Sequence, residues 1–542
     1  MWMLTIIQLL SLVGVIQAGY PPTPTGLTVI NSKFLPGVNI TYKKVKESIC
    51  DGKAASYAGY VNFPPSAMTG VDQTYPVNLF FWYFESQNKP QENPLSIWFN
   101  GGPGSASVFG LFAENGPCHI LNDSKTSVPN NYSWNKYSNM LYVDQPVQAG
   151  FSYDVITKGY MDLETASVYA GEVPNNSTTK IAGLFASQNI SNTANTTENA
   201  ARQFWYFLET WAQDFDRYTN NRQNFAINIW TESYGGRYGP AFARYIKEKN
   251  AEIQANSTKG KVLALENLGV INGCIDLLLQ EYSFPIMAFN NSYGIQAPHC
   301  YLDPFPAEYY DGYLALPDVQ QALGVPVNYT EGSLSIGQAF INTGDYARND
   351  KRGYPADIAY LLESNVQVAL VYGDRDFACN WIGGEKVSLA VESNYSAGFR
   401  AAGYADIQLE GSGNSSKSWG VVRQYGNYSF SRIYQSGHMV PAYQPELALE
   451  FFRRVLTSRD FATGEVDLIA NPHYATKGKN ASTHSEKPTP SPSPTCYYWF
   501  MPSTCAQTRS SVRLGQLVER LYYHVSHCSA CTCRAEQIPL LD

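Results

Sequence analysis

Three side chains that could together carry out nucleophilic catalysis stand at the ends of strand-like segments. Ser233 lies between the β-prone segment 225–230 and a helix-like segment that begins at Pro240. Asp376 follows the apolar run VQVALVYG, and His438 lies in a glycine-containing loop further along the chain. A serine hydroxyl becomes a nucleophile when a histidine accepts its proton and a carboxylate orients that histidine. Ser233 alone could equally be a helix N-cap, but the three residues together predict acyl transfer.

A glycine-rich segment, NGGPGSAS, supplies a second chemical feature. It begins at Asn100, directly after a strand-like run. It could cradle phosphate, but no lysine follows at P-loop spacing. Glycines also let backbone N–H groups approach a developing oxyanion, where one such donor contributes about 2.7–4 kcal/mol. We therefore predict an oxyanion hole here, with the N–H of Tyr234 as a second donor.

The segments that must position these residues alternate between strand-like and helical patterns. Strands are expected at 78–84, 94–100, 139–146 and 225–230, and in the runs LENLGVING and VQVALVYGD. Helices are expected at 198–215 and 444–456. Such alternation predicts a mainly parallel sheet between helices. The chain order Ser, Asp, His is that of the α/β-hydrolase fold, and residues 277–365 are expected to form an inserted cap.

Composition and the N-terminus indicate an extracellular protein. The net charge of the 542 residues is −8, which argues against nucleic acid as a partner. Residues 1–18 have the apolar core and the small residue before the cleavage point that are typical of a signal peptide, and the apolar run is short for a transmembrane anchor. Many N-x-S/T sequons predict N-glycosylation, among them those at Asn39, Asn122, Asn131, Asn195, Asn256, Asn328, Asn394, Asn427 and Asn480. Secretion would permit disulfides among the ten cysteines.

The C-terminal region differs in composition from the rest. After a catalytic domain expected at 19–476, residues 477–495 are rich in Pro and Ser and predict a linker. Residues 496–542 hold five cysteines and could form a disulfide-stapled tail. A zinc site at Cys528, Cys531 and Cys533 is a less favoured alternative. The chain ends in RAEQIPLLD, which is not the long apolar tail of a lipid-anchor signal, so anchoring stays open.

Six segments, taken in order, resemble the serine carboxypeptidase family. They are NGGPGS, ENGP, YVDQPVQAGFSY, ESYGGRYGP, GDRDFACN and GHMVP, and the similarity runs from about residue 27 to 456. Within that family the sequence is most similar to the secreted fungal carboxypeptidase S1 group. The resemblance implies a triad of Ser233, Asp376 and His438, and an oxyanion hole from Gly102 and Tyr234. It also implies a site for the substrate's terminal carboxylate at Asn100, Gly101, Glu232 and Glu114, and a leaving-group pocket lined by Cys379 and Met439.

Glu232, beside the nucleophile, would face an anionic substrate. Two close carboxylates cannot both ionise cheaply, so the pKa of one of them rises. A protonated Glu232 would donate a hydrogen bond to the substrate carboxylate. We therefore expect activity to be favoured at acid pH, although Glu232 could alternatively cap the following helix.

Several positions depart from the family pattern. Thr231 and Gln148 stand where glycine is common, and Ser105 stands where many members have cysteine. Spacing does not fix disulfide connectivity. We expect the pairs Cys50–Cys118 and Cys274–Cys300, and a free Cys379 if this chain follows the family.

The expected function is the removal of C-terminal amino acids from peptides and proteins with a free C-terminus. No metal or cofactor is required for this chemistry, and no HExxH motif is present. An acyltransferase or esterase of the same fold is one alternative, which the carboxylate-binding residues disfavour. A non-catalytic cell-wall glycoprotein is the other, and the complete triad disfavours it.

Overall fold

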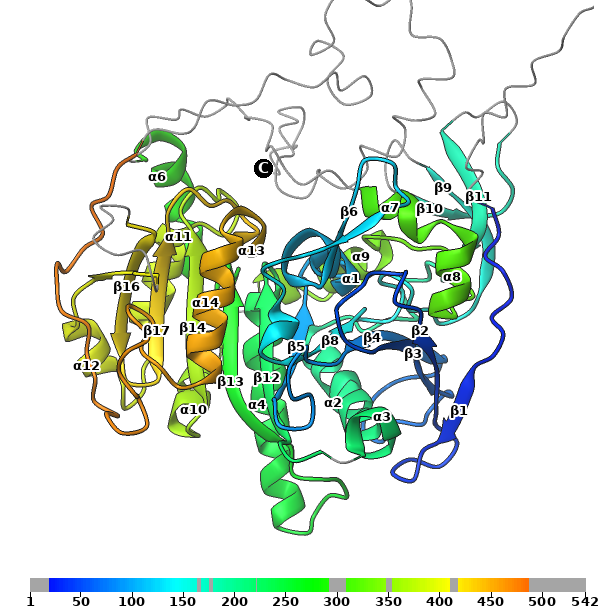
Figure 1. The fold of residues 1–542 in the computed structure, drawn as a ribbon, viewed down its shortest axis with the longest axis horizontal. Coiled ribbons are helices and arrows are strands. Elements are labelled where there is room, and N and C mark those ends of the chain that lie inside the picture. The colour runs from blue at the N-terminus through cyan, green and yellow to red at the C-terminus, as the bar shows by residue number, and fades with distance from the viewer. Residues whose placement is uncertain are drawn as a thin grey trace, which may run out of the picture.

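The computed structural model describes residues 19–162, 167–174, 179–220, 222–291, 309–347, 353–409 and 418–486. Across these residues the main sheet has twelve strands (Figure 1). In spatial order they are β1 (Thr28–Asn31), β2 (Asn39–Val45), β3 (Ser56–Phe63), β4 (Val77–Phe84), β8 (Asn139–Val143), β5 (Leu95–Phe99), β12 (Ala226–Glu232), β13 (Ala264–Ile271), β14 (Gln367–Gly373), β17 (Tyr428–Ile433), β16 (Gly420–Tyr425) and β15 (Ala405–Asp406).

The six neighbouring strands from β8 to β17 run parallel, and antiparallel strands flank them. Every residue of β12 and β14 is buried, as expected where helices cover both faces of a parallel sheet. Successive side chains point to opposite faces, so Ile229 joins one hydrophobic core and Trp230 joins the other. This mainly parallel sheet confirms the predicted α/β architecture.

Helices pack on both faces of the sheet. The core of Ile229 is shared with α2 (Thr197–Asp214), α4 (Gly235–Gln254), α10 (Gly353–Glu363), α11 (Trp381–Ala390) and α12 (Ser396–Ala401). The core of Trp230 is shared with α1 (Ser107–Gly110), the π-helix η1 (Leu111–Asn115) and α14 (Pro445–Leu456), which crosses the sheet beside β14 in Figure 1. Three shorter helices lie beside these elements: α3 (Asp216–Thr219) contacts α2, η2 (Trp134–Lys136) contacts β8, and α13 (Val440–Tyr443) contacts η1 and α14.

The region between β13 and β14 contains most of the added structure. Its described helices are α5 (Leu277–Gln280), α6 (Ser283–Phe289), α7 (Tyr309–Leu314), α8 (Pro317–Leu323), α9 (Leu334–Asn342) and η3 (Asp345–Ala347), followed by α10. Since α10 packs on α4 and β14, it belongs to the layer that covers the sheet. Two further small sheets had no counterpart in the sequence predictions: β6 (Cys118–Ile120) with β7 (Ser127–Pro129), and β9 (Thr157–Asp162) with β10 (Ser167–Ala170) and β11 (Lys180–Phe185).

Most of the predicted glycosylation positions lie at the surface. Six are exposed and two are half-buried: Asn122, Asn131, Asn195, Asn256, Asn394 and Asn480, then Asn39 and Asn427. Asn328 differs, because it is 7% exposed and its Oδ1 accepts a hydrogen bond from the N–H of Leu184 at 2.8 Å. Its Nδ2 donates to the carbonyl of Gly19 at 3.2 Å. A glycan on this amide does not fit the fold.

Several predicted segments lie outside the described residues. They are the signal peptide at 1–18, the linker from residue 487 onward, the tail at 496–542 with its cysteines, and Cys300. Among the helices that are described, none combines the length and apolar character needed to cross a membrane.

Candidate active site

Ser233 lies in a tight turn between β12 and α4. Its φ is +62°, a conformation that costs a non-glycine residue about 1–3 kcal/mol. Its N–H donates to the carbonyl of Ile271 at 3.1 Å, and its carbonyl accepts from the N–H groups of Gly236 and Cys274, each at 2.9 Å. These backbone bonds hold the strained turn, and its half-buried residue presents the hydroxyl at the strand's end. This is the strand–turn–helix context of a serine nucleophile.

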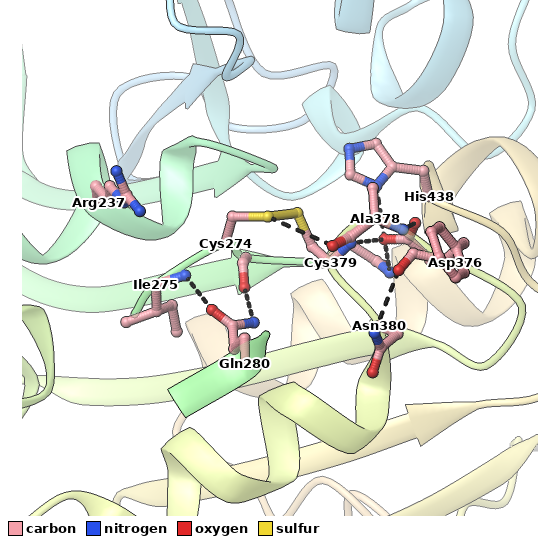
Figure 2. Close-up of a disulfide and its surroundings, with 12 residues drawn as sticks. Arg237, Cys274, Ile275, Gln280, Asp376, Ala378, Cys379, Asn380 and His438 are labelled. Atoms are coloured by element: carbon pink, nitrogen blue, oxygen red, sulfur yellow. Dashed lines mark hydrogen bonds and ion pairs between the residues drawn. A yellow bond between two sulfur atoms is a disulfide. The ribbon is translucent and has the colours of Figure 1, made fainter. Parts of the chain in front are cut away.

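Asp376 and His438 form a close pair. Nδ1 of His438 lies 2.6 Å from Oδ2 of Asp376 (Figure 2). The same carboxylate accepts from Asn272 Nδ2 at 2.8 Å, from the N–H of Cys379 at 3.2 Å, and from the N–H of Ala378 at 2.9 Å. An acceptor at Nδ1 places the proton of neutral imidazole there, so Nε2 is the nitrogen that can receive a proton.

The strand order brings these residues to one edge of the sheet. Ser233, Asp376 and His438 follow β12, β14 and β17, and β13 lies between the first two of these strands. The loop after β17 passes close to the end of β14, where a Cβ added to Gly373 would lie 2.1 Å from the carbonyl oxygen of Gly437. The carboxyl edge of a parallel sheet is where such folds place their sites.

The glycine-rich loop after β5 lies against the Ser233 turn. A Cβ added to Gly101 would lie 2.4 Å from the backbone nitrogen of Tyr234 and 2.7 Å from the carbonyl oxygen of Glu232. No larger residue could allow this approach. Gly102 has φ +104°, a backbone conformation that favours glycine. The two predicted oxyanion donors, Gly102 and Tyr234, therefore belong to adjoining backbone segments.

Asn100, Glu114 and Glu232 form a buried polar cluster beside this turn. Nδ2 of Asn100 lies 3.2 Å from Oε1 of Glu114 and 3.4 Å from Oε1 of Glu232. The Asn100 oxygen accepts from Trp98 Nε1 at 2.8 Å and from the N–H of Gly110 at 3.0 Å. Because that oxygen is already satisfied, the amide nitrogen is oriented toward the two acids.

Burial changes the protonation of the two acids. Loss of hydration raises the pKa of Glu114 to about 7, although hydrogen bonds from its neighbours lower it. The pKa of Glu232 is raised well above its usual range, first by burial and then by the charge of Glu114. A hydrogen bond between the two carboxyl groups, which lowers the pKa of Glu114 and raises that of Glu232, requires a proton on one of them. At acid pH the cluster therefore holds at least one proton.

The family model described as serine carboxypeptidase matches residues 50–300 and 295–458 of this chain. The chain belongs to the serine carboxypeptidase family. A carboxypeptidase Y homolog of Arthroderma benhamiae is 42% identical over 93% of this chain and 92% of its own length. Carboxypeptidase S1 homolog A of Arthroderma otae is 41% identical over 95% and 91%, and carboxypeptidase S1 of Penicillium janthinellum is 31% identical over 71% and 94%.

The crystal structure of Kex1(delta)p, a prohormone-processing carboxypeptidase from Saccharomyces cerevisiae, has the same fold. It superposes with a TM-score of 0.57 at 19% identity and covers 78% of this chain and 94% of that one. The predicted family and the α/β-hydrolase fold are thus confirmed, and this serine carboxypeptidase is a hydrolase.

Thr231, which this carboxypeptidase has where glycine is common, is accommodated by two glycines. A Cβ on Gly235 would lie 2.6 Å from the Thr231 Cβ, and one on Gly239 would lie 2.8 Å from its Oγ1. The hydroxyl of Thr231 donates to the carbonyl of Gly235 at 2.8 Å. The added side chain therefore packs under the first turn of α4 without displacing it.

Gln148 and Ser105 also have local explanations. Gln148 has φ +86°, which accounts for glycine at this position elsewhere, and its Nε2 donates to the carbonyls of Asn189 and Asn192 at 2.9 and 3.1 Å. The side chain thus ties two loops together at the expense of backbone strain. Ser105 forms an isolated antiparallel bridge with Gly332, so backbone pairing joins its loop to the inserted region.

One predicted disulfide is present and one prediction was wrong. Cys50 is bonded to Cys118, as expected. Cys274 is bonded to Cys379 (Figure 2), so Cys274 does not pair with Cys300 and Cys379 is not free. The ends of β13 and β14 lie side by side, which brings two cysteines 105 residues apart in sequence into contact.

The disulfide alters the pocket expected for the leaving group. Cys379 is 2% exposed and offers a bonded sulfur instead of a thiol. Its Sγ, a carboxylate oxygen of Asp376 and a ring nitrogen of His438 lie within 4.8 Å of one another, but a disulfide sulfur is a poor metal ligand. Met439 is half-buried and packs against the core of Trp230.

Asn272 is a site residue that the sequence reasoning missed. It follows β13, and its Nδ2 donates to Asp376 while its Oδ1 accepts from the N–H of Gly373 at 2.9 Å. Its φ is +41°, in the left-handed region that asparagine tolerates better than most residues. The signal available in the sequence was a polar residue at the end of a buried strand.

Proposed function

We propose that this enzyme removes C-terminal amino acids from peptides and proteins at acid pH, through an acyl-enzyme on Ser233. The observation that carries the proposal is the buried cluster of Asn100, Glu114 and Glu232 next to the serine turn. A hydrolase that acted on internal bonds or simple esters would gain nothing from a proton-holding acid pair at this position. An enzyme that recognises a free carboxylate would gain from such an acid pair.

In the acylation step, His438 Nε2 takes the proton of the Ser233 hydroxyl as the oxygen attacks the last peptide carbonyl. Asp376 holds the imidazole orientation and stabilises the imidazolium. The N–H groups of Gly102 and Tyr234 bind the oxyanion of the tetrahedral intermediate. His438 then gives its proton to the departing amino group, and water hydrolyses the acyl-enzyme with the same base.

Recognition of the terminal carboxylate falls to Asn100, the Gly101 backbone and the acid pair. With a proton on the pair, Glu232 or Glu114 donates a hydrogen bond to the substrate carboxylate. When both acids ionise, they repel it. The pKa of Glu114 is about 7 and that of Glu232 is raised well above its usual range, so the pair loses its last proton when Glu232 ionises, and substrate binding weakens on that alkaline side.

We further propose that the enzyme is secreted and glycosylated. The N-terminal signal-like segment, the exposed sequons and the two disulfides support this location. In that setting its substrates are external peptides with a free C-terminus. Membrane attachment would require a lipid anchor.

The test compares one N-blocked peptide with a free C-terminus against the same peptide with an amidated C-terminus, from pH 4 to pH 8. Release of the last residue from the free acid only, strongest at acid pH and lost in Ser233→Ala, is the expected result. Equal cleavage of both peptides would leave a serine hydrolase but overturn carboxylate recognition. Faster turnover of simple esters with transfer to added alcohols would favour an acyltransferase or esterase.

A further inference from the structure

Two consecutive residues of the inserted region contact both segments of the proposed oxyanion hole. Asp345 and Tyr346 are the first two residues of η3, between α9 and α10. The Asp345 carboxylate accepts a hydrogen bond from the hydroxyl of Tyr234. The Tyr346 hydroxyl donates to the carbonyl of Gly102 at 3.4 Å. Thus one short segment, far from both in sequence, reaches the two residues whose N–H groups are proposed to bind the oxyanion.

Asp345 is itself held firmly. It is 2% exposed, and its Oδ1 accepts from the N–H of Thr197 at 3.1 Å. Its Oδ2 accepts from the hydroxyl of Thr197 at 2.7 Å, in addition to the bond from Tyr234. The first residue of α2 therefore fixes the carboxylate that holds the Tyr234 ring.

A buried arginine joins Asp345 and Tyr346 to α4. Arg237 is 3% exposed, and it donates to the backbone carbonyls of Asp345, at 2.8 Å, and of Tyr346. Its guanidinium lies 4.9 Å from the ring centroid of Tyr234, and the rings of Tyr234 and Tyr346 are 5.1 Å apart. Within the described residues no carboxylate lies within ion-pair distance of this cation, so carbonyls and aromatic faces compensate it.

These contacts address a specific problem of the site. Gly102 has no side chain to restrain it, and Tyr234 directly follows the strained Ser233. Oxyanion donors must be held to within about 0.5 Å of the productive geometry. Contacts from one rigid segment to both residues would fix their N–H groups relative to each other.

We propose that Asp345 and Tyr346 are positioning residues that hold the Gly102 and Tyr234 N–H groups in one arrangement, an element we call the Asp345–Tyr346 clamp. The proposal rests on the oxyanion role proposed above for those two residues. Neither clamp residue touches the reacting atoms. Both act through the geometry of the donors, and folding of the inserted region thereby completes the site.

The test uses the full-length enzyme with Tyr346→Phe and Asp345→Asn. Tyr346→Phe removes one hydroxyl from a half-buried ring, and Asp345→Asn replaces one accepting oxygen by a donor. The matched control is Thr343→Val, because Thr343 in the same segment donates to the carbonyl of Asn195 at 2.6 Å and contacts neither oxyanion donor. Folding of each variant is checked by thermal unfolding.

Three quantities are measured for each variant. They are kcat and KM on the free-acid peptide, the inhibition constant of an N-blocked peptide aldehyde that forms a tetrahedral adduct with Ser233, and that of the free amino acid product. We expect kcat to fall about threefold in Tyr346→Phe and about tenfold in Asp345→Asn, less than the 10²–10³-fold loss on removing a donor. Aldehyde binding should weaken in parallel, while KM and product inhibition stay within about twofold.

The clamp is supported if aldehyde binding weakens in step with kcat in the two clamp variants but not in Thr343→Val. A merely structural role would not affect the tetrahedral state more than substrate binding. Values for both variants that match Thr343→Val would overturn it and leave the proposed function intact. If Asp345→Asn does not fold, Tyr346→Phe decides. A wild-type enzyme that neither cleaves the free-acid peptide nor reacts with a serine-directed phosphonate would overturn the proposed function, and the clamp with it.

Discussion

The bond between Cys274 and Cys379 joins the turn that carries Ser233 to the loop that carries Asp376. The N–H of Cys274 donates to the carbonyl of Ser233 at 2.9 Å. The N–H of Cys379 donates to Oδ2 of Asp376 at 3.2 Å (Figure 2). One covalent link therefore fixes the distance between two backbone groups that position the proposed nucleophile and the proposed orienting acid.

Replacing this disulfide should impair catalysis as well as stability. In Cys274→Ser with Cys379→Ser, we expect stability to fall by about 2–4 kcal/mol and kcat to fall about tenfold or more, because small displacements of reacting groups have large effects on rate. Denaturant unfolding and steady-state kinetics on the free-acid peptide measure the two effects separately.

The second disulfide provides a matched control. Cys50 and Cys118 make no hydrogen bond to the Ser233 turn or the Asp376 loop among the described residues. Cys50→Ser with Cys118→Ser should lose stability by a similar amount and keep kcat within about twofold. Equal losses of kcat in the two double variants would show that general destabilisation, not positioning, explains the effect.

Neutralising Glu232 should flatten the alkaline side of the pH profile. On the alkaline side, where Glu232 loses the last proton of the pair, KM of the wild type for a free-acid peptide should rise by up to about tenfold per pH unit. Glu232→Gln keeps a neutral hydrogen-bond donor at that position at every pH, so the rise should be much smaller. An N-blocked amino-acid ester, which lacks the terminal carboxylate, should show no such rise in either protein. An unchanged profile in Glu232→Gln would contradict the role of the pair.

Gln148 allows backbone strain to be separated from side-chain bonding. Gln148→Ala removes the hydrogen bonds to Asn189 and Asn192 but keeps a Cβ at φ +86°. Gln148→Gly removes the same bonds and the strain. We expect Ala to lower the free energy of unfolding, and Gly to be more stable than Ala by about 1 kcal/mol. Equal stabilities of the two variants would argue against strain at this position.

Glu209 should make the folded state less stable as the pH rises toward neutrality. It is fully buried in α2, and burial raises its pKa from the usual 4.5 to about 7. The folded state thus holds a proton that the unfolded chain has lost, so the stabilisation present below about pH 4.5 disappears as the pH rises through 7. The slope is at most about 1.4 kcal/mol per pH unit. Denaturant unfolding at pH 5 and pH 7 should differ less in Glu209→Gln than in the wild type, and an equal difference would contradict the assignment.

The triad loops could be predicted because strand ends are readable from sequence. Buried apolar runs precede Ser233 and Asp376, and parallel strands place their carboxyl ends at one edge. The acid pair of Glu114 and Glu232 was predicted from the resemblance to the family, and burial, seen only in three dimensions, gives it its raised pKa values. Asn272 was missed because nothing in its local sequence shows which strand becomes its neighbour.

Contacts that depend on the inserted region were the least predictable. The sequence around Asp345 and Tyr346 shows no helical or alternating periodicity, so no pattern indicates that these residues reach Tyr234 and Gly102. The start of α4 was placed five residues late, at Pro240. Gly235 and Gly236 are poor helix formers, yet tight packing requires small residues there, since a Cβ on Gly236 would lie 2.9 Å from the backbone of Gly273.

The position of β17 in the sheet determines when, during synthesis of the chain, the proposed active site can form. This strand, which precedes the His438 loop, pairs with β14 on one side and β16 on the other, so the last third of the catalytic domain completes the sheet edge. A growing chain that already contains Ser233 and its glycine-rich loop still lacks His438, the base proposed to activate the hydroxyl. On the proposed mechanism, the polypeptide is therefore inactive during its synthesis. It becomes a peptidase only when β17 and the closing helix α14 have packed onto the sheet.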